Sequence, residues 1–252
     1  MMRILFLAPL LGLVALGCGG KADRYEDIQK LRALGVFSDK PVVQPSTTVT
    51  PQVVTLTFYA ALPHGDTVTA ETYQDTATSS GGTPATLTVN AGTAAVEAHS
   101  SFDLYHVSGT LNIPPVEALV FRGLDRNATV QYGIKLTTKA SGSQNIVGSV
   151  VVFPAGAPQL TSLAATPTIK ITAPAKSAAL SGAQDIVATA STTGAETLRL
   201  GWFVNGGEIK NRNAAATTWD PVKTTGAVTL VVTARGAKTG AFALDVIDFT
   251  AN

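Results

Sequence analysis

The chain has 252 residues, of which 14% are charged, and its 18 basic and 17 acidic residues nearly cancel. Ordinary soluble domains carry about 25% charged residues, so this chain is poor in charge. A nearly neutral chain lacks the basic excess of nucleic-acid-binding proteins, and we therefore predict no nucleic-acid partner.

The first segment has the features of a secretory signal peptide. Arg3 is the only charge before Lys21, and residues 4–16 are almost wholly apolar. One positive charge, a short apolar run and small residues at its end are typical of an export signal. The run is shorter than the ~20 apolar residues of a membrane-spanning helix. We therefore predict that residues 1–17 are removed.

The end of this segment, Ala15-Leu16-Gly17-Cys18, resembles the lipobox of bacterial lipoproteins, in which a small residue precedes an obligatory cysteine. The resemblance covers only the first twenty residues, and Leu16 stands one place later than the family commonly has its leucine. It implies that Cys18 carries a diacylglyceryl thioether and an N-acyl chain such as palmitate. Gly19 in place of aspartate implies delivery to the outer membrane, on its periplasmic or cell-surface face.

Two physical arguments support lipidation at Cys18. Stable anchoring needs more than one acyl chain, and three chains would hold the protein permanently. Cys18 is also the only cysteine in the chain, so an exported form has no internal disulfide to make. The expected partner is thus membrane lipid, bound through acylated Cys18. The alternative is an ordinary secreted protein with a lone cysteine.

Alternating apolar and polar residues predict an all-β protein. The strongest strands are 53–62 and 128–138, and the second of these is expected to form a hairpin with 146–153 through a turn at 141–145. Residues 25–34 fit a short helix, but we prefer a strand at 31–37. The other expected strands are 67–73, 85–90, 94–99, 102–111, 168–172, 185–190, 197–204, 214–219, 228–235 and 241–250.

The spacing of proline, glycine and alanine suggests where the chain divides. We predict a signal peptide at 1–17, a lipidated tether at 18–27, a β-sandwich at 28–153, a linker at 154–167 and a second sandwich at 168–252.

The last segment, 168–252, resembles bacterial immunoglobulin-like domains, including the PKD-like kind. The resemblance rests on Trp202 in the third strand, on Asn205 and Gly206 after it, and on the final long strands 228–235 and 242–249. It implies a fold of two antiparallel immunoglobulin-like β-sandwich domains, without a disulfide. Asn205-Gly206-Gly207 is the strongest hairpin signal in the chain. No repeat is clear enough to align the two halves.

Candidate chemistry is sparse. Glu97 and His99 share one strand face and could supply two metal ligands, but nothing in the sequence indicates further ligands. We therefore prefer a hydrogen-bonded or solvated role for both side chains. The same role is preferred for His64, Asp103 and His106. No nucleophile, phosphate-loop or zinc-protease motif occurs. We predict no catalytic residues, no cofactor and no metal. The carboxylates considered as possible pairs, with surface solvation preferred, are Asp66, Glu71, Asp75, Asp245 and Asp248.

Exposed aromatic side chains could form a platform for carbohydrate. The candidates are Tyr59, Tyr73, Tyr105, Tyr132, Trp202 and Trp219. Trp202 is expected in the core, Trp219 fits core or surface equally, and Tyr59 is expected to face solvent because it lies opposite the apolar side of its strand.

The sequence therefore predicts an outer-membrane lipoprotein with a non-catalytic binding, adhesion or envelope-structural role. Its further partner would be an envelope protein or a carbohydrate. Two alternatives stay open. One is an extracytoplasmic hydrolase or its carbohydrate-binding accessory module, and the other is a periplasmic assembly factor that pairs a strand edge with a client.

Overall fold

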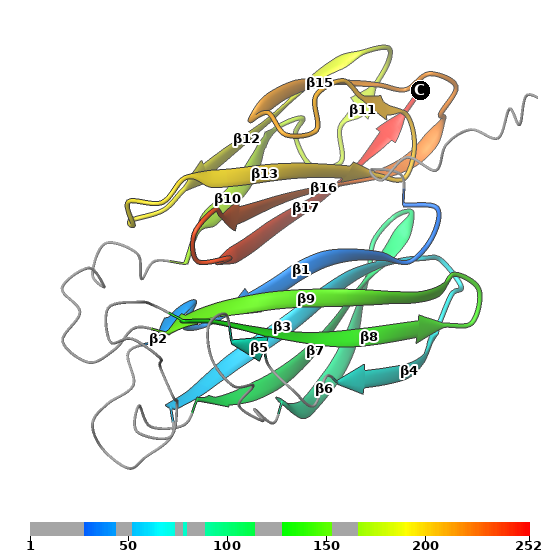
Figure 1. The fold of residues 1–252 in the computed structure, drawn as a ribbon. Helices are drawn as coiled ribbons and strands as arrows, with labels where there is room; N and C mark the ends of the chain where they lie inside the picture. Colours follow the sequence, from blue (N-terminus) through cyan, green and yellow to red (C-terminus); the bar gives the residue numbers. More distant parts are fainter. Residues whose placement is uncertain (1–27, 44–51, 74–77, 80–88, 114–127, 153–165) are drawn as a thin grey trace, which may run out of the picture.

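The computed structural model describes residues 28–43, 52–73, 78–79, 89–113, 128–152 and 166–252 (Figure 1). Throughout these ranges the regular structure is β-strand, which confirms the predicted all-β class. Within the same ranges, no helix has the length and apolar character to cross a bilayer.

The strands form two sandwiches, one above the other in Figure 1. In the first, a sheet in the order β1-β3-β7-β6 faces a sheet in the order β2-β9-β8-β4, with β5 paired to β8. Its strands are β1 (Arg32–Ser38), β2 (Val42–Val43), β3 (Gln52–Pro63), β4 (Val68–Tyr73), β5 (Thr78–Ser79), β6 (Val89–Ala98), β7 (Phe102–Ile113), β8 (Ala128–Thr138) and β9 (Gly142–Val152).

In the second sandwich, a sheet in the order β10-β12-β15-β14 faces a sheet in the order β11-β17-β16-β13. Its strands are β10 (Thr168–Ala173), β11 (Ala179–Leu180), β12 (Gln184–Ser191), β13 (Leu198–Val204), β14 (Glu208–Ile209), β15 (Ala216–Asp220), β16 (Gly226–Gly236) and β17 (Phe242–Ala251).

Both sandwiches have the same connectivity. The first strand of each is divided: β1 and β10 pair antiparallel with the next long strand, whereas β2 and β11 pair parallel with the last strand of the opposite sheet. The other strands follow the immunoglobulin arrangement, in which strands A, B, E and D form one sheet and C, F and G the other. The fold is therefore two antiparallel immunoglobulin-like sandwiches. The repeat lies in the topology, which explains why the residues did not reveal it.

Each sandwich has an apolar core made by one face of each sheet. In the first, the inward side of β3 supplies Val54, Leu56, Phe58, Ala60 and Leu62. In the second, Trp202 and Trp219 are fully buried, and the Trp219 ring packs edge-on against Phe249 with 4.9 Å between centroids. Each indole N–H donates to a backbone carbonyl, Trp202 to Ala214 and Trp219 to Gly206. Trp202 is thus a core residue, as expected.

Strand 32–38 confirms a strand rather than a helix near the start of the described chain. The strand predicted at 94–99 is confirmed by β6, which begins at Val89 and has an irregular register between Ala91 and Ala94, so residues 89–98 form one strand. Residues 85–88 of the strand predicted at 85–90 lie outside the described residues. The turn predicted at 141–145 is wrong. The chain turns at 139–141, because Asp66 accepts hydrogen bonds from the N–H groups of Ala140 and Ser141, and β9 already begins at Gly142.

The predicted hairpin at Asn205-Gly206-Gly207 is not formed. The strand after it, β14, pairs with β15, so this segment carries the chain from one sheet to the other. Gly207 has a φ of 82°, and a Cβ there would overlap the Trp219 indole. Of the three residues only Gly207 has a positive φ, whereas the predicted hairpin turn needed two such residues.

Candidate functional site

The outer faces of two sheets meet between the sandwiches. In the second sandwich, β13, β16 and β17 pair so that outward-facing residues form rows across the sheet. One row consists of the paired residues Thr229 and Asp248. The neighbouring row, two residues further along β16, consists of Phe203, Val231 and Val246. The junction therefore changes from polar to apolar along the strands.

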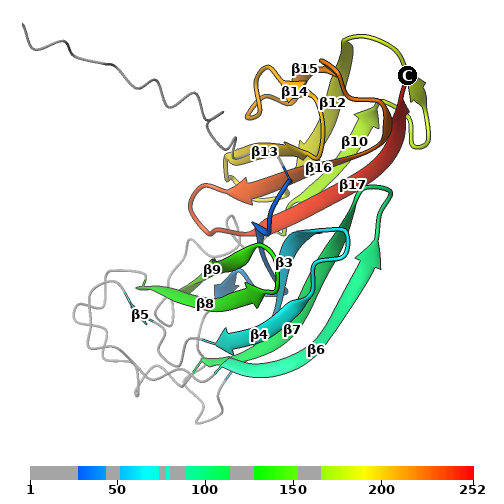
Figure 2. The ribbon, with the colours of Figure 1, turned by 90° about the vertical axis from the view of Figure 1, so that its right-hand side faces the viewer.

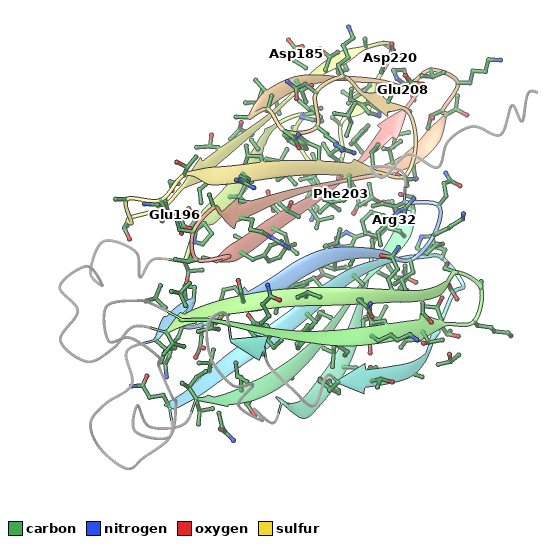
Figure 3. The ribbon with its side chains drawn as sticks, in the orientation of Figure 1. Arg32, Asp185, Glu196, Phe203, Glu208 and Asp220 are labelled. Atoms are coloured by element: carbon green, nitrogen blue, oxygen red, sulfur yellow. The ribbon has the colours of Figure 1, made fainter. Side chains whose placement is uncertain are left out.

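The middle of the junction is a third apolar cluster, shared by both sandwiches. Figure 3 shows Phe203 on the side of β13 that faces the first sandwich. The Phe242 ring lies 6.1 Å from the Tyr59 ring, and a Cβ at Gly35 would overlap Phe242, so β1 leaves room for this ring by having no side chain there. The buried members are Ile28, Leu34, Ala61, Phe102, Leu104, Phe203, Val231 and Phe242.

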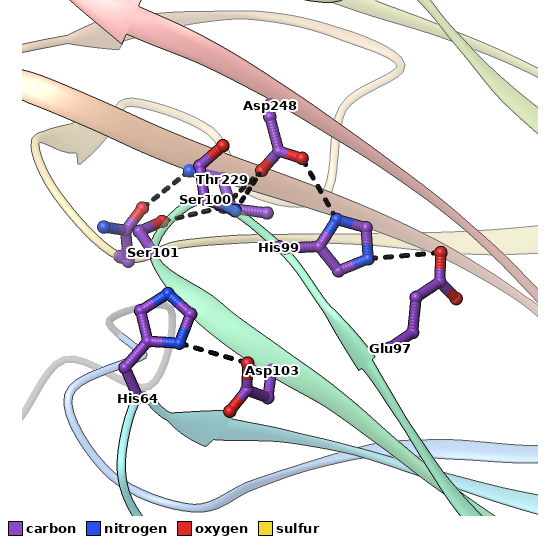
Figure 4. Close-up of polar contacts among 9 residues, drawn as sticks. His64, Glu97, His99, Ser100, Ser101, Asp103, Thr229 and Asp248 are labelled. Carbon is purple, nitrogen blue, oxygen red and sulfur yellow. Dashed lines mark hydrogen bonds and ion pairs between the residues drawn. The ribbon is translucent and has the colours of Figure 1, made fainter.

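A polar cluster lies at one end of this junction. The turn between β6 and β7 reaches up beside β17 (Figure 2), where His99 Nδ1 is 3.2 Å from Asp248 Oδ2. The backbone N–H of Ser100 donates to Asp248 Oδ1 at 3.0 Å (Figure 4). Ser101 Oγ donates to Thr229 Oγ1 at 2.7 Å, and Thr229 Oγ1 donates to Asp248 Oδ1 at 2.6 Å. One carboxylate thus holds donors from both sandwiches.

These bonds determine how Asp248 titrates. Burial alone would raise the pKa of Asp248, but the hydrogen bonds from Thr229, Ser100 and His99, together with electrostatic attraction to His99, outweigh burial. The pKa of this carboxyl is therefore lower than usual, and Asp248 stays ionised at neutral pH.

The same cluster contains serine, histidine and aspartate, but it is not arranged for nucleophilic catalysis. A serine nucleophile must bond to the imidazole nitrogen that is not held by the carboxylate. Here His99 Nε2 lies 3.6 Å from Glu97 Oε1, and Ser101 Oγ bonds to Thr229 instead. In the described part of the chain His99 is hydrogen-bonded through Nδ1 only, and its Nε2 faces the exposed Glu97 at an ion-pair distance that is too long for a hydrogen bond.

The other two histidines lie apart from this cluster. His64 Nδ1 is 3.0 Å from Asp103 Oδ1 near the turn after β3, and the His106 ring packs at 5.8 Å against Tyr59. Among the residues that the structure describes, no three histidine, cysteine or acidic side chains are grouped so that they could hold a metal ion.

The start of the described chain also contacts the second sandwich. The N–H of Ile28 donates to the carbonyl of Val204 at 3.0 Å, and Gln29 Nε2 donates to the carbonyl of Asn205 at 3.2 Å. Ile28 is 3% exposed and belongs to the apolar cluster. The described chain therefore begins at the junction itself.

The other candidate carboxylates that the structure describes do not converge with Asp248. Asp66 accepts from Thr67, Ala140 and Ser141, and although burial would raise its pKa, hydrogen bonds led by Ser141 lower it to about 2. Asp245 accepts from the N–H of Ile171 at 2.7 Å and so ties β17 to β10. Glu71 is on β4, and Asp75 lies outside the described residues.

The aromatic candidates do not form a platform. Tyr105, Tyr132, Trp202 and Trp219 are buried, and Tyr73 packs edge-on against Phe58 in the first core. The expectation that Tyr59 faces solvent is wrong, because the second sandwich covers it through Phe242.

Sequence reasoning missed the junction, although a signal was present. In β17 both strand faces are apolar: Phe242, Leu244 and Val246 point one way, and Ile247 and Phe249 the other. A strand that is apolar on both faces is buried on both faces. Cys18 lies outside the described residues, so its lipidation stays a prediction.

Comparisons with known proteins give no family for this chain. No family model matches the chain, and no curated protein sequence matches it. One similar solved structure is the fibronectin(III)-like modules of Clostridium thermocellum CbhA, with 14% identity and a TM-score of 0.33 over 86% of this chain and 94% of that one.

Two others are three N-terminal domains of the bacteriophage RB49 Highly Immunogenic Outer Capsid protein and a tandem of titin Ig domains. The first is 14% identical with a TM-score of 0.27 and covers 88% of this chain and 59% of that one. The second is 11% identical with a TM-score of 0.22, and the match covers 89% of this chain and 99% of the titin chain. At such values these likenesses indicate no function for this chain.

Proposed function

We propose that the chain is a lipid-anchored bacterial envelope protein, without catalysis, whose two immunoglobulin-like sandwiches act as one rigid body in binding, adhesion or envelope structure. The observation that carries this proposal is the apolar cluster between the sandwiches. Interfaces between domains of one chain usually permit relative motion unless they are apolar and well packed. This one is apolar at its centre and hydrogen-bonded at the Asp248 end, so it favours a fixed arrangement.

The use of the polar side chains supports a non-catalytic role. His99, Asp248 and Thr229, which offer the most reactive combination at the junction, bond to each other and to backbone groups across it. Asp66 is likewise occupied by a turn. A glycoside hydrolase canonically needs two carboxylates that face one glycosidic bond, whereas Asp66 and Asp248 hold separate structural elements.

The place where the described chain begins supports a particular attachment to the membrane. Residues 18–27 can span at most about 36 Å, because an extended chain advances no more than ~3.6 Å per residue. They lead to Ile28, which is buried at the junction. A lipid on Cys18 would thus hold the tandem by its middle and keep both sandwiches near the bilayer surface.

Fractionation of cells tests the anchor. Cys18→Ala should move the full-length protein from the membrane fraction to the soluble envelope fraction, because no acyl chain can then be attached. Lys21→Ala, three residues away, is the matched control and should stay with membranes. Protease added to intact cells, followed through a C-terminal tag, would then distinguish an outward from a periplasmic face. A Cys18→Ala protein that remained in the membrane fraction would contradict the lipid anchor.

A further inference from the structure

A groove of about 300 Å³ lies between the sandwiches, at the end of the junction away from Asp248. Gln131 and Ser149 from β8 and β9 line one side. Arg199 of β13, Arg235 of β16 and Lys238 in the turn after β16 line the other. Its volume is at the lower end of the range for small-molecule sites.

The groove is strongly basic for a chain of so little charge. The described residues that line it include three cations, Arg199, Arg235 and Lys238, and no acidic side chain. Arg199 and Arg235 are directly opposite each other on paired strands. Like charges at such positions repel, so the pair costs stability unless an anion lies between them.

Nothing in the described part of the chain neutralises these cations. No carboxylate there lies within 4.0 Å of the arginines or of the Lys238 ammonium. Glu196 belongs to the same end of the sandwich, but its oxygens accept from the N–H groups of Lys238 and Thr239 and from Thr239 Oγ1. That carboxylate holds the turn in shape and makes no ion pair with the Lys238 ammonium.

Polar groups of the first sandwich complete the lining. Ser149 Oγ donates weakly, at 3.5 Å, to the carbonyl of Thr239, and Gln131 is exposed. Behind Gly148, which lines the groove, the hydroxyl of Tyr132 is buried and has no hydrogen-bond partner. Burial raises the pKa of this phenol, and the charge of Arg235 opposes that rise.

Arg235, one of the three cations, lies against a ring that also packs across the junction. The Arg235 guanidinium lies 5.9 Å from the centre of the Phe242 ring, and Phe242 packs on Gly35 of the first sandwich. The groove therefore exists only while the two sandwiches are docked. Such a site needs little reorganisation when a ligand binds.

We infer that this groove binds the phosphate monoester group of a small molecule, a glycan or a lipid headgroup, with Arg199 and Arg235 as its main ligands and Lys238 as a third. Guanidinium groups match phosphate oxygens with paired hydrogen bonds, and a dianion balances two opposed arginines better than a single carboxylate does. The inference rests on the proposed binding role and names the chemical class that it would recognise.

Calorimetric titration of the full chain in low-salt buffer tests this site, with glucose 6-phosphate as ligand and glucose and glucuronate as neutral and singly charged controls. We expect heat of binding with the phosphate sugar only. Arg199→Gln with Arg235→Gln should weaken binding at least ~10-fold, since each charge-assisted hydrogen bond to phosphate contributes a sizeable part of the affinity. Lys170→Gln with Lys223→Gln removes two exposed charges elsewhere and should leave binding unchanged.

Sedimentation with vesicles distinguishes a lipid from a free ligand, using the Cys18→Ala chain so that the anchor plays no part. Binding to phosphatidic acid vesicles, but not to phosphatidylcholine vesicles, would support a lipid headgroup, provided that the arginine variant does not bind. Binding of glucose 6-phosphate alone would support a soluble ligand or glycan. No binding in either assay, or binding equally weakened in the lysine control, would overturn the inference.

A melting experiment gives a second readout that does not depend on the choice of sugar. Without phosphate, Arg199→Gln should raise the melting temperature at low salt, because it removes a like-charge contact. With phosphate, the wild-type chain should gain more than the variant, because ligand binding stabilises the folded state. Equal gains in both proteins would overturn the site. Membrane attachment through Cys18 would be unaffected, so the proposed function would stand.

Discussion

The cores of the two sandwiches and the junction between them are all apolar, but they are made in different ways. Each core uses one face of its strands, and in the second core the indole N–H of Trp202 donates to the carbonyl of Ala214. The junction uses the opposite face of the same strands and depends on a ring, Phe242, that crosses from one sandwich to a glycine of the other. The comparison teaches that the cores determine whether each sandwich folds, and the junction whether the two act as one body.

The largest loss of unfolding free energy should come from a substitution in the core of the second sandwich. Trp202→Ala should lower the free energy of unfolding of the second sandwich by about 4–5 kcal/mol, because it leaves a cavity and an unpaired carbonyl at Ala214. Denaturant melts followed by Trp219 fluorescence would measure it. A loss below ~1 kcal/mol would place Trp202 outside the core. Val96→Ala, at a residue that is 59% exposed, should have almost no effect.

Substitution at the junction should lower the free energy of unfolding by less, and it should also change the number of thermal transitions. Phe242→Ala should cost about 3 kcal/mol, at the low end for a buried phenylalanine, and should separate one thermal transition into two. The reason is that each sandwich keeps its own core while the coupling between them is lost. Gly35→Ala should act in the same direction, since the new methyl group overlaps the Phe242 ring. Calorimetry that still showed one transition in both variants would contradict this role.

The smallest loss of unfolding free energy should come from substitution in the polar cluster around Asp248, and this loss should depend on pH. Asp248→Asn should cost about 1–2 kcal/mol, because it weakens charge-assisted hydrogen bonds. The folded-state pKa of Asp248 is lower than its unfolded value of ~3.9, so its stabilisation is complete above about pH 4 and is lost as the pH falls through the folded pKa. Melts between pH 2 and 7 should show a steeper acid loss for wild type than for the variant. Asp185→Asn, exposed on β12, is the control, and equal acid slopes in wild type and Asp248→Asn would contradict the assignment.

Much of the fold followed from alternation along the chain. Strands such as 53–62 and 128–138 were predictable because one face is apolar and the other polar, and Trp202 was correctly placed in the core. Alternation could not show which sheet a strand joins, so the segment at Asn205 was assigned to a hairpin although β14 pairs with β15. The Tyr59 error has the same origin, because a residue opposite the core face is exposed only when nothing packs on that face.

The candidate sites were less predictable than the fold. Glu97 and His99 were recognised as neighbours, but their partner Asp248 is 149 residues from His99 in the sequence. The pair Arg199 and Arg235 depends on the register between β13 and β16, which single residues do not specify. Sequence patterns indicate faces of strands, and both sites are made by contacts between faces of separate elements.

The most direct test of the account is the tumbling of the two sandwiches in solution. Backbone ¹⁵N relaxation on the full chain carrying Cys18→Ala would give a rotational correlation time for each sandwich separately. The account predicts one shared correlation time for both, and separate, shorter times in Phe242→Ala. Independent tumbling of the two sandwiches with Phe242 in place would contradict the claim that the junction makes them one body.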